Sequence, residues 1–453
     1  MPWARPDRHG PNIEYKQKLR QISITNFRSR FVPYRFSAIR LYNASTEVAM
    51  RMKRLTLVFL LCSFAVGAYA QNAYTPPRGA WERRTPEQAG MDAAKLKEAI
   101  DLAKASESRT PRNLETAHYR SFGREPFGEA IGLFKDRGDQ TGIIIRNGYI
   151  VAEWGQPERV DMTFSVTKSF ISTTVGLAFD RQLIRSLQDR AADYSAPIAQ
   201  YLPGQRYDVA ERFGKPQFIE LFASEHNQKI TWEHLLRQTS DWEGTLWGKP
   251  DWADRPDRDP ETWLTRQRSE PGTVYKYNDV RVNVLALAAL DVWRRPLPEV
   301  MRELVMDEIG ASNTWRWHGY ENSYVILDGR IIQSVSGGGH WGGGLFINAY
   351  DMARFGLLTS RNGRWGNKQV LSEEFLRQAR TPTAAQPTYG FMNYFLNTEK
   401  RLLPAAPASA YSHVGNGVNT IFIDPENDLV IVLRWIEQAK INEFIEKVIA
   451  SLR

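Results

Sequence analysis

The chain has 453 residues, of which 42% are hydrophobic and 24% are charged, a composition typical of a globular protein. Its mean hydropathy of −0.46 excludes a protein made of many membrane spans. The net charge of +8 comes from residues 1–70, which carry 12 Lys and Arg against 3 Asp and Glu and leave 47 against 48 for the rest. Because the body of the chain is neutral, we expect no nucleic-acid partner.

The first feature in chain order is an apolar run that follows a cluster of positive charges. Residues 50–54 read MRMKR, residues 55–66 are almost entirely apolar, and the small-residue pattern AYA ends at residue 70. This order is typical of a secretory signal peptide, and the apolar run is short for a membrane span. We predict a signal peptide over 50–70, cleavage before Gln71, and a periplasmic or secreted protein with no stable membrane span after cleavage.

The predicted signal peptide also restricts how the sequence before and after it can be interpreted. Residues 1–49 stand upstream of the signal and are predicted to be either a misplaced translation start or a disordered extension. The single cysteine, Cys62, lies in the apolar run, so the mature chain would contain none. That excludes disulfide bonds, a thiolate nucleophile and a cysteine-based zinc site. The histidines lack metal-ligand spacing, so we expect no metal and no cofactor.

Residues 71–453 are predicted to form one domain that begins and ends with strands. An amphipathic helix is expected over 91–105, because its apolar side chains recur on one face. A β-hairpin follows over 141–154, where an Asn-Gly turn separates two β-branched runs. Further helices and a second hairpin are expected at 164–184, 231–238, 280–293, 349–360, 418–435 (the hairpin) and 437–452.

This order of elements predicts an α/β (α+β) fold. Strands at both chain ends with helices between them favour one antiparallel sheet that is built from the two ends and flanked by helices. The middle of the chain, about 185–335, is predicted to form a mostly helical subdomain inserted into that frame.

Ser165 and Lys168 have a spacing that suggests chemistry. They lie at the start of the helix expected from residue 164, one turn apart on the same face, so their side chains can share a hydrogen bond. A serine hydroxyl needs a base within reach, and a buried lysine can become neutral and act as one. The N–H groups at a helix N-terminus can stabilise an oxyanion. Because Ser-x-x-Lys also arises by chance, the alternative is an exposed pair without function.

Four further motifs follow the first one in the chain. The five are 163–170 (TFSVTKSF), 231–240 (TWEHLLRQTS), 271–279 (PGTVYKYND), 343–345 with 351–355 (GGL and DMARF), and 413–415 (HVG). Over about residues 85–450 the chain resembles the serine β-lactamase superfamily, especially class C β-lactamases, D-alanyl-D-alanine peptidases and family VIII esterases. The resemblance implies a β-lactamase/transpeptidase-like fold and a serine hydrolase that works through an acyl-enzyme.

The resemblance also implies catalytic roles for individual residues. Ser165 takes the place of the nucleophile, and Lys168 takes the place of its first base. Tyr277 takes the place of the catalytic tyrosine that shuttles a proton; otherwise it is a buried ring with one hydrogen bond, and Tyr275 is its rival. The backbone N–H groups of Ser165 and Asn416 would form the oxyanion hole.

Other residues near the cleft are expected to bind substrate. His413 and Gly415 stand on the strand beside the cleft, where His413 would orient a substrate carbonyl or carboxylate; the alternative is a satisfied strand-end histidine. In the stretch GGGHWGGG, His340 and Trp341 are expected to line the pocket, with plain packing as the alternative. That stretch is not a phosphate-binding loop, because no Lys-Ser/Thr follows it.

Two departures from the family pattern limit the expected substrate. His413 replaces a lysine, which removes a permanent cation for a β-lactam carboxylate, and Asp279, also expected at the substrate site, replaces a neutral asparagine. The expected function is therefore hydrolysis of an ester or amide, of the esterase, amide hydrolase or D-amino-acid peptidase type, on a small molecule or short peptide. The alternatives are a weak β-lactamase and a non-catalytic protein that binds cell-wall peptides on the same fold.

Overall fold

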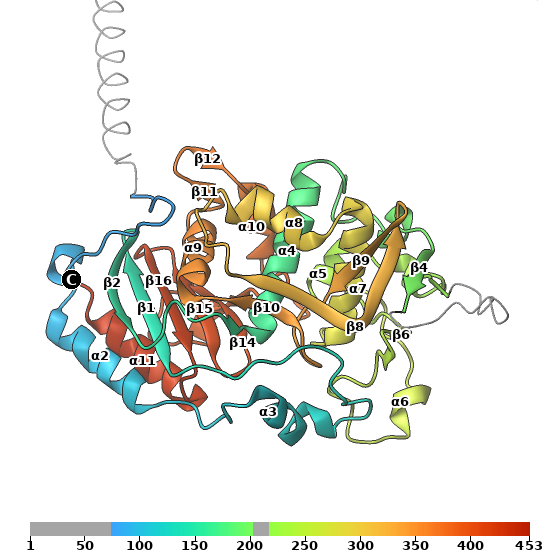
Figure 1. Ribbon diagram of the computed structural model, residues 1–453, viewed down its shortest axis with the longest axis horizontal. Coiled ribbons are helices and arrows are strands. Elements are labelled where there is room, and N and C mark those ends of the chain that lie inside the picture. The colour runs from blue at the N-terminus through green and yellow to red at the C-terminus, as the bar shows by residue number, and fades with distance from the viewer. Residues whose placement is uncertain (1–73, 203–216) are drawn as a thin grey trace, which may run out of the picture. The chain divides into compact units, whose positions relative to one another are not determined.

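Strands from both ends of the polypeptide form the main sheet (Figure 1). The computed structural model describes residues 74–202 and 217–453, so the predicted signal peptide and residues 1–49 lie outside the described residues. Within the unit Asn72–Arg453, six strands follow the order β13-β14-β15-β16-β1-β2, and every neighbouring pair is antiparallel. Their bounds are β1 (Thr141–Arg146), β2 (Tyr149–Trp154), β13 (Phe395–Leu396), β14 (Tyr411–Gly415), β15 (Asn419–Asp424) and β16 (Leu429–Arg434).

The pairing of β1 with β16 confirms the predicted antiparallel sheet. Ile143 of β1 lies opposite Val432 of β16, so the two chain regions meet in the middle of the sheet. The first hairpin turns at Asn147 and Gly148, whose φ angles of 52° and 84° are both positive. A two-residue turn of this kind matches the twist of the flanking strands, which is why the Asn-Gly signal predicted it correctly.

Helices cover both faces of this sheet. Ile144 packs in an apolar layer with α2 (Ala93–Ala105) and α11 (Ile441–Ala450), which lie side by side in Figure 1. Its neighbours in β1 point the other way, into a layer with α4 (Thr167–Asp180) and α9 (Ala349–Ser360). Successive strand residues face opposite sides, so a sheet covered on both faces needs apolar residues at nearly every position.

The remaining elements include a second sheet. Its path is β3 (Asp161–Met162), β10 (Gly344–Ile347), β8 (Arg316–Leu327), β4 (Ile198–Tyr201) and β5 (Phe218–Ile219), with β9 (Arg330–Val335) paired to β8. The other described helices and short hairpins are α3 (Leu114–Arg120), α5 (Trp232–Leu236), α6 (Thr262–Thr265), α7 (Asp279–Trp293), α8 (Leu297–Met301), α10 (Glu373–Ala379), β6 (Thr245–Leu246), β7 (Lys249–Pro250), β11 (Arg364–Trp365) and β12 (Lys368–Gln369).

The middle segment also contains strands that the sequence did not predict. Within 185–335 the structure contains the long β8–β9 hairpin as well as helices α5 to α8. The pairing of β8 with β9 shifts register between Gly319 and Tyr324, which interrupts the alternation that would have marked the strand in the sequence.

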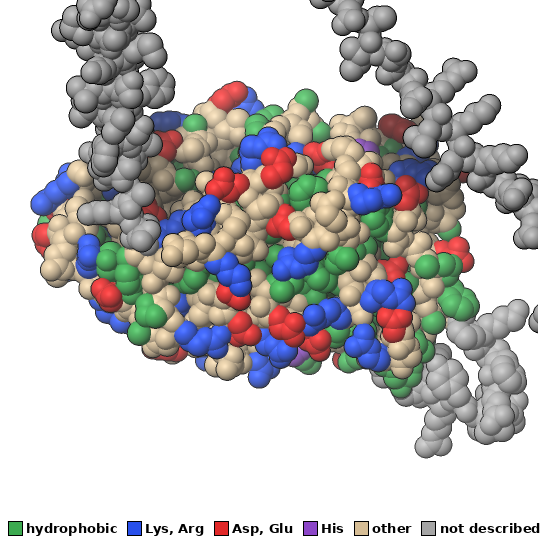
Figure 2. Space-filling view, turned by 90° about the horizontal axis from the view of Figure 1, so that it is seen from above, with side chains coloured by type: hydrophobic (Ala, Val, Ile, Leu, Met, Phe, Trp, Pro, Cys, Tyr) green, Lys and Arg blue, Asp and Glu red, His purple; other side chains and the backbone are tan. Residues whose placement is uncertain are grey.

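Two buried helices place the residues of interest at one point. Nearly every side chain of α4 and of α7 is buried, and the two helices pack against each other. The Ser-x-x-Lys motif lies at the N-terminal end of α4, and the Tyr-Asn-Asp motif lies at that of α7. No helix in the described ranges is both long and apolar enough to cross a membrane. On the face seen in Figure 2, basic and acidic side chains are interspersed, as expected from the neutral charge balance of residues 71–453.

Candidate active site

Ser165 lies in a tight turn at the start of α4. The turn is the short 3-10 helix η3 (Phe164–Val166), which runs directly into α4. Phe164 has a φ of 49°, a left-handed conformation that a residue with a side chain adopts at a cost of about 1 kcal/mol or more. Ser165 itself is half-buried, so its hydroxyl remains within reach of a substrate.

Lys168 contacts Ser165 from one turn further along the helix. Its Nζ donates to Ser165 Oγ at 2.8 Å and to Asp279 Oδ1 at 2.7 Å. The Lys168 side chain is 0% exposed, and Nζ lies 4.7 Å from the centre of the Tyr277 ring. The residue types that the spacing predicted as a nucleophile and its base are therefore in hydrogen-bond contact.

The charges around Lys168 act in opposite directions on its proton. Burial lowers the pKa of the Lys168 ammonium, Asp279 opposes this, and the nearby Arg255 adds to the lowering, so the pKa lies below its ordinary value. Burial alone would raise the pKa of the Asp279 carboxyl, but Lys168 and Arg255 together hold it well below its usual range. Asp279 is thus an ionised carboxylate between two cations.

Tyr277, and not its rival Tyr275, contacts the Ser165–Lys168 pair. Lys168 Nζ lies 4.7 Å from the centre of the Tyr277 ring, and Ser165 is near enough to lower the pKa of the Tyr277 phenol, whereas the Tyr275 ring lies 5.0 Å from the ring of Tyr389. Burial raises the pKa of the Tyr277 phenol, and the negative charge of Asp279 raises it further. Tyr277 is therefore a neutral phenol at ordinary pH, able to donate a proton and accept one in turn.

Strand β14 passes close to the backbone of the predicted nucleophile. A Cβ atom on Gly415 would stand 2.0 Å from the carbonyl oxygen of Thr163 and 3.2 Å from the nitrogen of Ser165. Only glycine lets the strand come this near, which explains the residue type at this point of the motif. Asn416 follows directly after Gly415 and is exposed, so the two backbone groups predicted to hold an oxyanion belong to neighbouring segments.

His413 and Trp341 do not line an open cleft, and the prediction that they contact substrate needs correction. His413 is 0% exposed, and its Nδ1 lies 2.9 Å from the hydroxyl of Ser169. Burial lowers the pKa of His413 to about 3, so the ring is neutral. Trp341 is also 0% exposed and packs against Tyr320. Both rings lie inside the protein, because neighbouring segments pack over the two stretches of chain that carry them.

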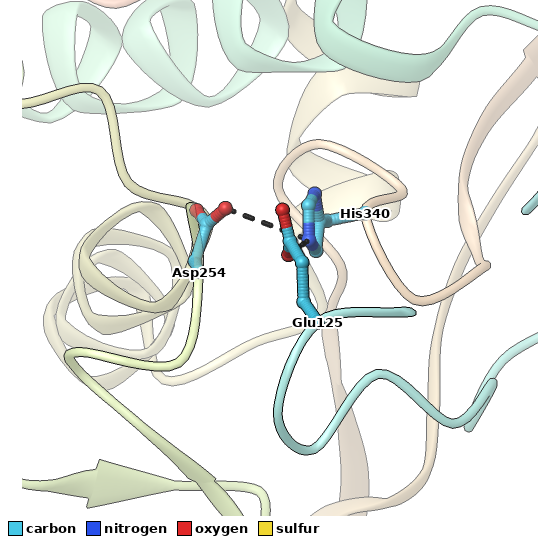
Figure 3. Close-up of side chains that lie close together, drawn as sticks. All are labelled: Glu125, Asp254 and His340. Atoms are coloured by element: carbon cyan, nitrogen blue, oxygen red, sulfur yellow. Dashed lines mark hydrogen bonds and ion pairs between the residues drawn. The ribbon is translucent and has the colours of Figure 1, made fainter. Parts of the chain in front are cut away.

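His340 is buried as well, and it belongs to a cluster of charged groups. Its Nε2 lies 2.8 Å from Glu125 Oε2 and 3.5 Å from Asp254 Oδ1. Figure 3 shows the three side chains pointing toward one another from three separate segments. Their donor atoms lie within 4.8 Å of one another, which is the composition and spacing of a metal site. His340 therefore contacts charged partners instead of lining an open pocket, which corrects the prediction for this residue.

Sequence reasoning missed Arg255, Asp254 and Glu125. Arg255 Nη1 donates to Asp279 Oδ2 at 3.1 Å and to Asp254 Oδ1, and its side chain is 34% exposed. No spacing rule connects these residues to the motifs, because they lie in loops between two motifs or before the first one. A positive φ of 49° at Arg255 is the one local sign of a constrained position.

Solved structures that are similar to this chain cover about four fifths of it. Similar solved structures include a penicillin-binding protein homologue from Caulobacter crescentus, with 13% identity, a TM-score of 0.49, and coverage of 80% of this chain and 99% of the other. An octameric penicillin-binding protein homologue from Pyrococcus abyssi has 15% identity, a TM-score of 0.48, and coverage of 79% and 76%. A family VIII carboxylesterase has 16% identity, a TM-score of 0.47, and coverage of 80% and 99%.

The family assignment rests on the sequence itself. The beta-lactamase family model matches residues 137–435, a range that begins just before β1 and ends just after β16. It therefore spans the central sheet, the Ser165–Lys168 pair, Tyr277 and the 413–415 motif. This chain belongs to the beta-lactamase family.

Proposed function

We propose that this protein hydrolyses an ester or amide through an acyl-enzyme on Ser165. The observation that carries the proposal is the 2.8 Å hydrogen bond between Ser165 Oγ and the Nζ of the wholly buried Lys168. A buried amine next to a half-exposed hydroxyl is the arrangement that activates a serine without a histidine. Family membership supports a hydrolase of this superfamily.

The reaction would use each group in a definite step. Neutral Lys168 accepts the proton of Ser165 while Oγ attacks the substrate carbonyl, and the N–H groups of Ser165 and Asn416 hold the resulting oxyanion. Tyr277 donates its phenolic proton to the leaving group and regains one from the Lys168 ammonium, which becomes neutral again. A water molecule then attacks the acyl-enzyme and releases the acid, which returns Ser165 to its starting state.

The substrate is proposed to be an ester, amide or short peptide in preference to a β-lactam. The neutral, buried His413 provides no cation for a β-lactam carboxylate at the position where relatives carry lysine. Asp279 adds a negative charge beside the nucleophile. Both features disfavour a substrate that must place a carboxylate next to the reacting carbonyl.

Labelling with a fluorophosphonate probe tests the proposal directly. The probe reacts with an activated serine, and mass spectrometry of the digested protein identifies the residue that carries it. We expect the label on Ser165. A protein that takes up no label and hydrolyses no activated ester would instead support a peptide-binding role on the same fold.

The Asp279→Asn variant is expected to work at lower pH than the wild type. Lys168 must lose its proton before it can act as a base, so kcat/KM rises as the pH passes the pKa of Lys168. The Asp279 carboxylate holds that pKa up, and removing its charge lets burial lower the pKa further. The rising limb of the kcat/KM profile for an activated ester should move down by about one pH unit or more. An unchanged profile would mean that Asp279 does not govern the proton on Lys168.

We also propose that the protein is exported and that its mature form begins at or near Gln71. The support is the basic, apolar and small-residue order of residues 50–70. N-terminal sequencing of protein purified from the native host should find Gln71 or a neighbouring residue first. Recovery of a chain that still carries residues 1–49 would contradict both the export and the cleavage.

A further inference from the structure

One carboxylate in the site, that of Asp279, pairs with two cations. Asp279 Oδ1 accepts from Lys168 Nζ at 2.7 Å, and Asp279 Oδ2 accepts from Arg255 Nη1 at 3.1 Å. The side chain of Asp279 is 1% exposed, so these contacts are made away from bulk water. Each oxygen of the carboxylate therefore has its own cationic partner.

An acidic residue at this position is a problem for a lysine base. A carboxylate 2.7 Å from Nζ stabilises the ammonium, and an ammonium cannot accept the proton of Ser165. If Lys168 were the only partner of Asp279, loss of its proton would leave a buried and unpaired carboxylate, which is strongly unfavourable. With Arg255 present, the neutral form of Lys168 leaves Asp279 in a complete ion pair.

We propose that Arg255 is a positioning residue of this hydrolase, which keeps Lys168 available as a base by taking over the Asp279 carboxylate. The inference rests on the proposed function, because it concerns the base of that reaction. It explains how the chain tolerates an aspartate where its relatives have a neutral asparagine: the arginine supplies the compensating charge.

The structure holds Arg255 in place for this role. Its guanidinium lies over the Tyr277 ring, 4.9 Å from the ring centre, and over the Phe122 ring, 5.3 Å from the ring centre. Asp254 binds Nη1 with one oxygen and accepts the backbone N–H of Asp279 with the other. Asp254 thereby ties Arg255 to the N-terminus of α7, whose N–H groups also meet part of its negative charge.

The Glu125–His340–Asp254 cluster shown in Figure 3 also helps to hold Arg255, because His340 contacts the Asp254 carboxylate. It has the composition of a metal site, but the Asp254 oxygen that faces His340 already binds the Arg255 guanidinium, which would repel a second cation. His340 Nδ1 has no hydrogen-bond partner among the described residues, whereas a metal-bound histidine usually donates its other N–H. We therefore interpret the cluster as a set of side chains that holds the Asp254 carboxylate in position.

All charged and titratable groups near Lys168 enter the expected pH response. They come from the start of α7 and the loop before it, from the 251–261 loop, from the segment before β10 and from the segment before β13, and they are Asp279, Tyr277, Arg255, Asp254, His340 and Tyr389. Among these groups, Arg255 is the second cation that contacts Asp279. Its removal would leave Asp279 paired with Lys168 alone.

A charge-balance cycle tests the proposal through the pH dependence of kcat/KM for an activated ester. In Arg255→Gln, Asp279 pairs only with Lys168, so the rising limb should move to higher pH by about one unit, with about a tenfold loss below the limb. Arg255→Lys keeps the charge and should lie between this variant and the wild type. In Arg255→Gln/Asp279→Asn both charges are gone, so the limb should return toward the wild-type position.

Arg258→Gln is the matched control, because Arg258 carries the same charge on the same loop but is exposed. It should leave the profile unchanged. A limb that stays in place in Arg255→Gln, or a loss of activity that is uniform at all pH values, would overturn the proposal while Ser165 labelling still supports the hydrolase. If the wild type takes up no label and cleaves no ester, the hydrolase proposal fails and this one fails with it.

Discussion

The Ser165→Ala variant is expected to lose hydrolysis of an activated ester by about three orders of magnitude or more. The substitution removes only the nucleophilic hydroxyl, so no acyl-enzyme can form. The fold should remain, because Ser165 is half-buried and Lys168 keeps its ion pair with Asp279. Measuring kcat/KM together with the thermal melting curve separates loss of chemistry from loss of structure.

Ser172→Ala provides a matched control on the same helix. Its hydroxyl is buried and has no hydrogen-bond partner among the described residues, so its removal should change neither activity nor stability by much. Fluorophosphonate should label Ser172→Ala but not Ser165→Ala. Wild-type rates in Ser165→Ala would remove Ser165 from the mechanism.

The Lys168→Met variant is expected to lose activity by a factor comparable to that of Ser165→Ala. Methionine fills a similar volume in this fully buried position, and Asp279 remains paired with Arg255, so the variant should fold. Without the amine, the group left beside Ser165 is the neutral Tyr277 phenol, which is a far weaker base than a neutral amine. The kcat/KM for an activated ester and the rate of fluorophosphonate labelling both measure this loss.

The double variant tests whether the two residues work together. Groups that act as a unit give losses that do not add, so Ser165→Ala/Lys168→Met should be no less active than either single variant. Losses that multiply would indicate that Lys168 contributes independently of Ser165, and the shared-proton mechanism would then be incorrect.

Local patterns in the sequence determined the frame of the fold. The Asn147-Gly148 turn specified the first hairpin, because its backbone needs two positive φ angles that these residues tolerate. The segment 280–293, which Gly and Pro do not interrupt, predicted a helix that the structure places at Asp279–Trp293 as α7. Signals of this kind act between neighbours in the chain, so they can be interpreted without knowing the tertiary structure.

The sequence motifs identified which residues lie together in the site, but they explained only part of how the fold brings these residues into contact. Ser165 and Lys168 are one helical turn apart, so the sequence alone brings their side chains together. Tyr277 and Asp279 reach them from another helix, and only the packing of α4 against α7 makes that contact. The order of the motifs along the chain, through its resemblance to a family, suggested that Tyr277 and Asp279 contact the Ser165–Lys168 pair. It did not give the physical cause of that contact.

Burial and long-range ion pairs were decided by the tertiary structure. His413 and Trp341 have the residue types of a binding site, yet neighbouring segments cover them completely. Arg255 lies far from Lys168 in the chain, and its partnership with Asp279 exists because two loops and two helices converge. The sequence by itself determined the sheet from both chain ends and the Ser165–Lys168 pair. The tertiary structure decided how the charge of Asp279 is balanced, because an electrostatic contact depends on distance in space and not on separation along the chain.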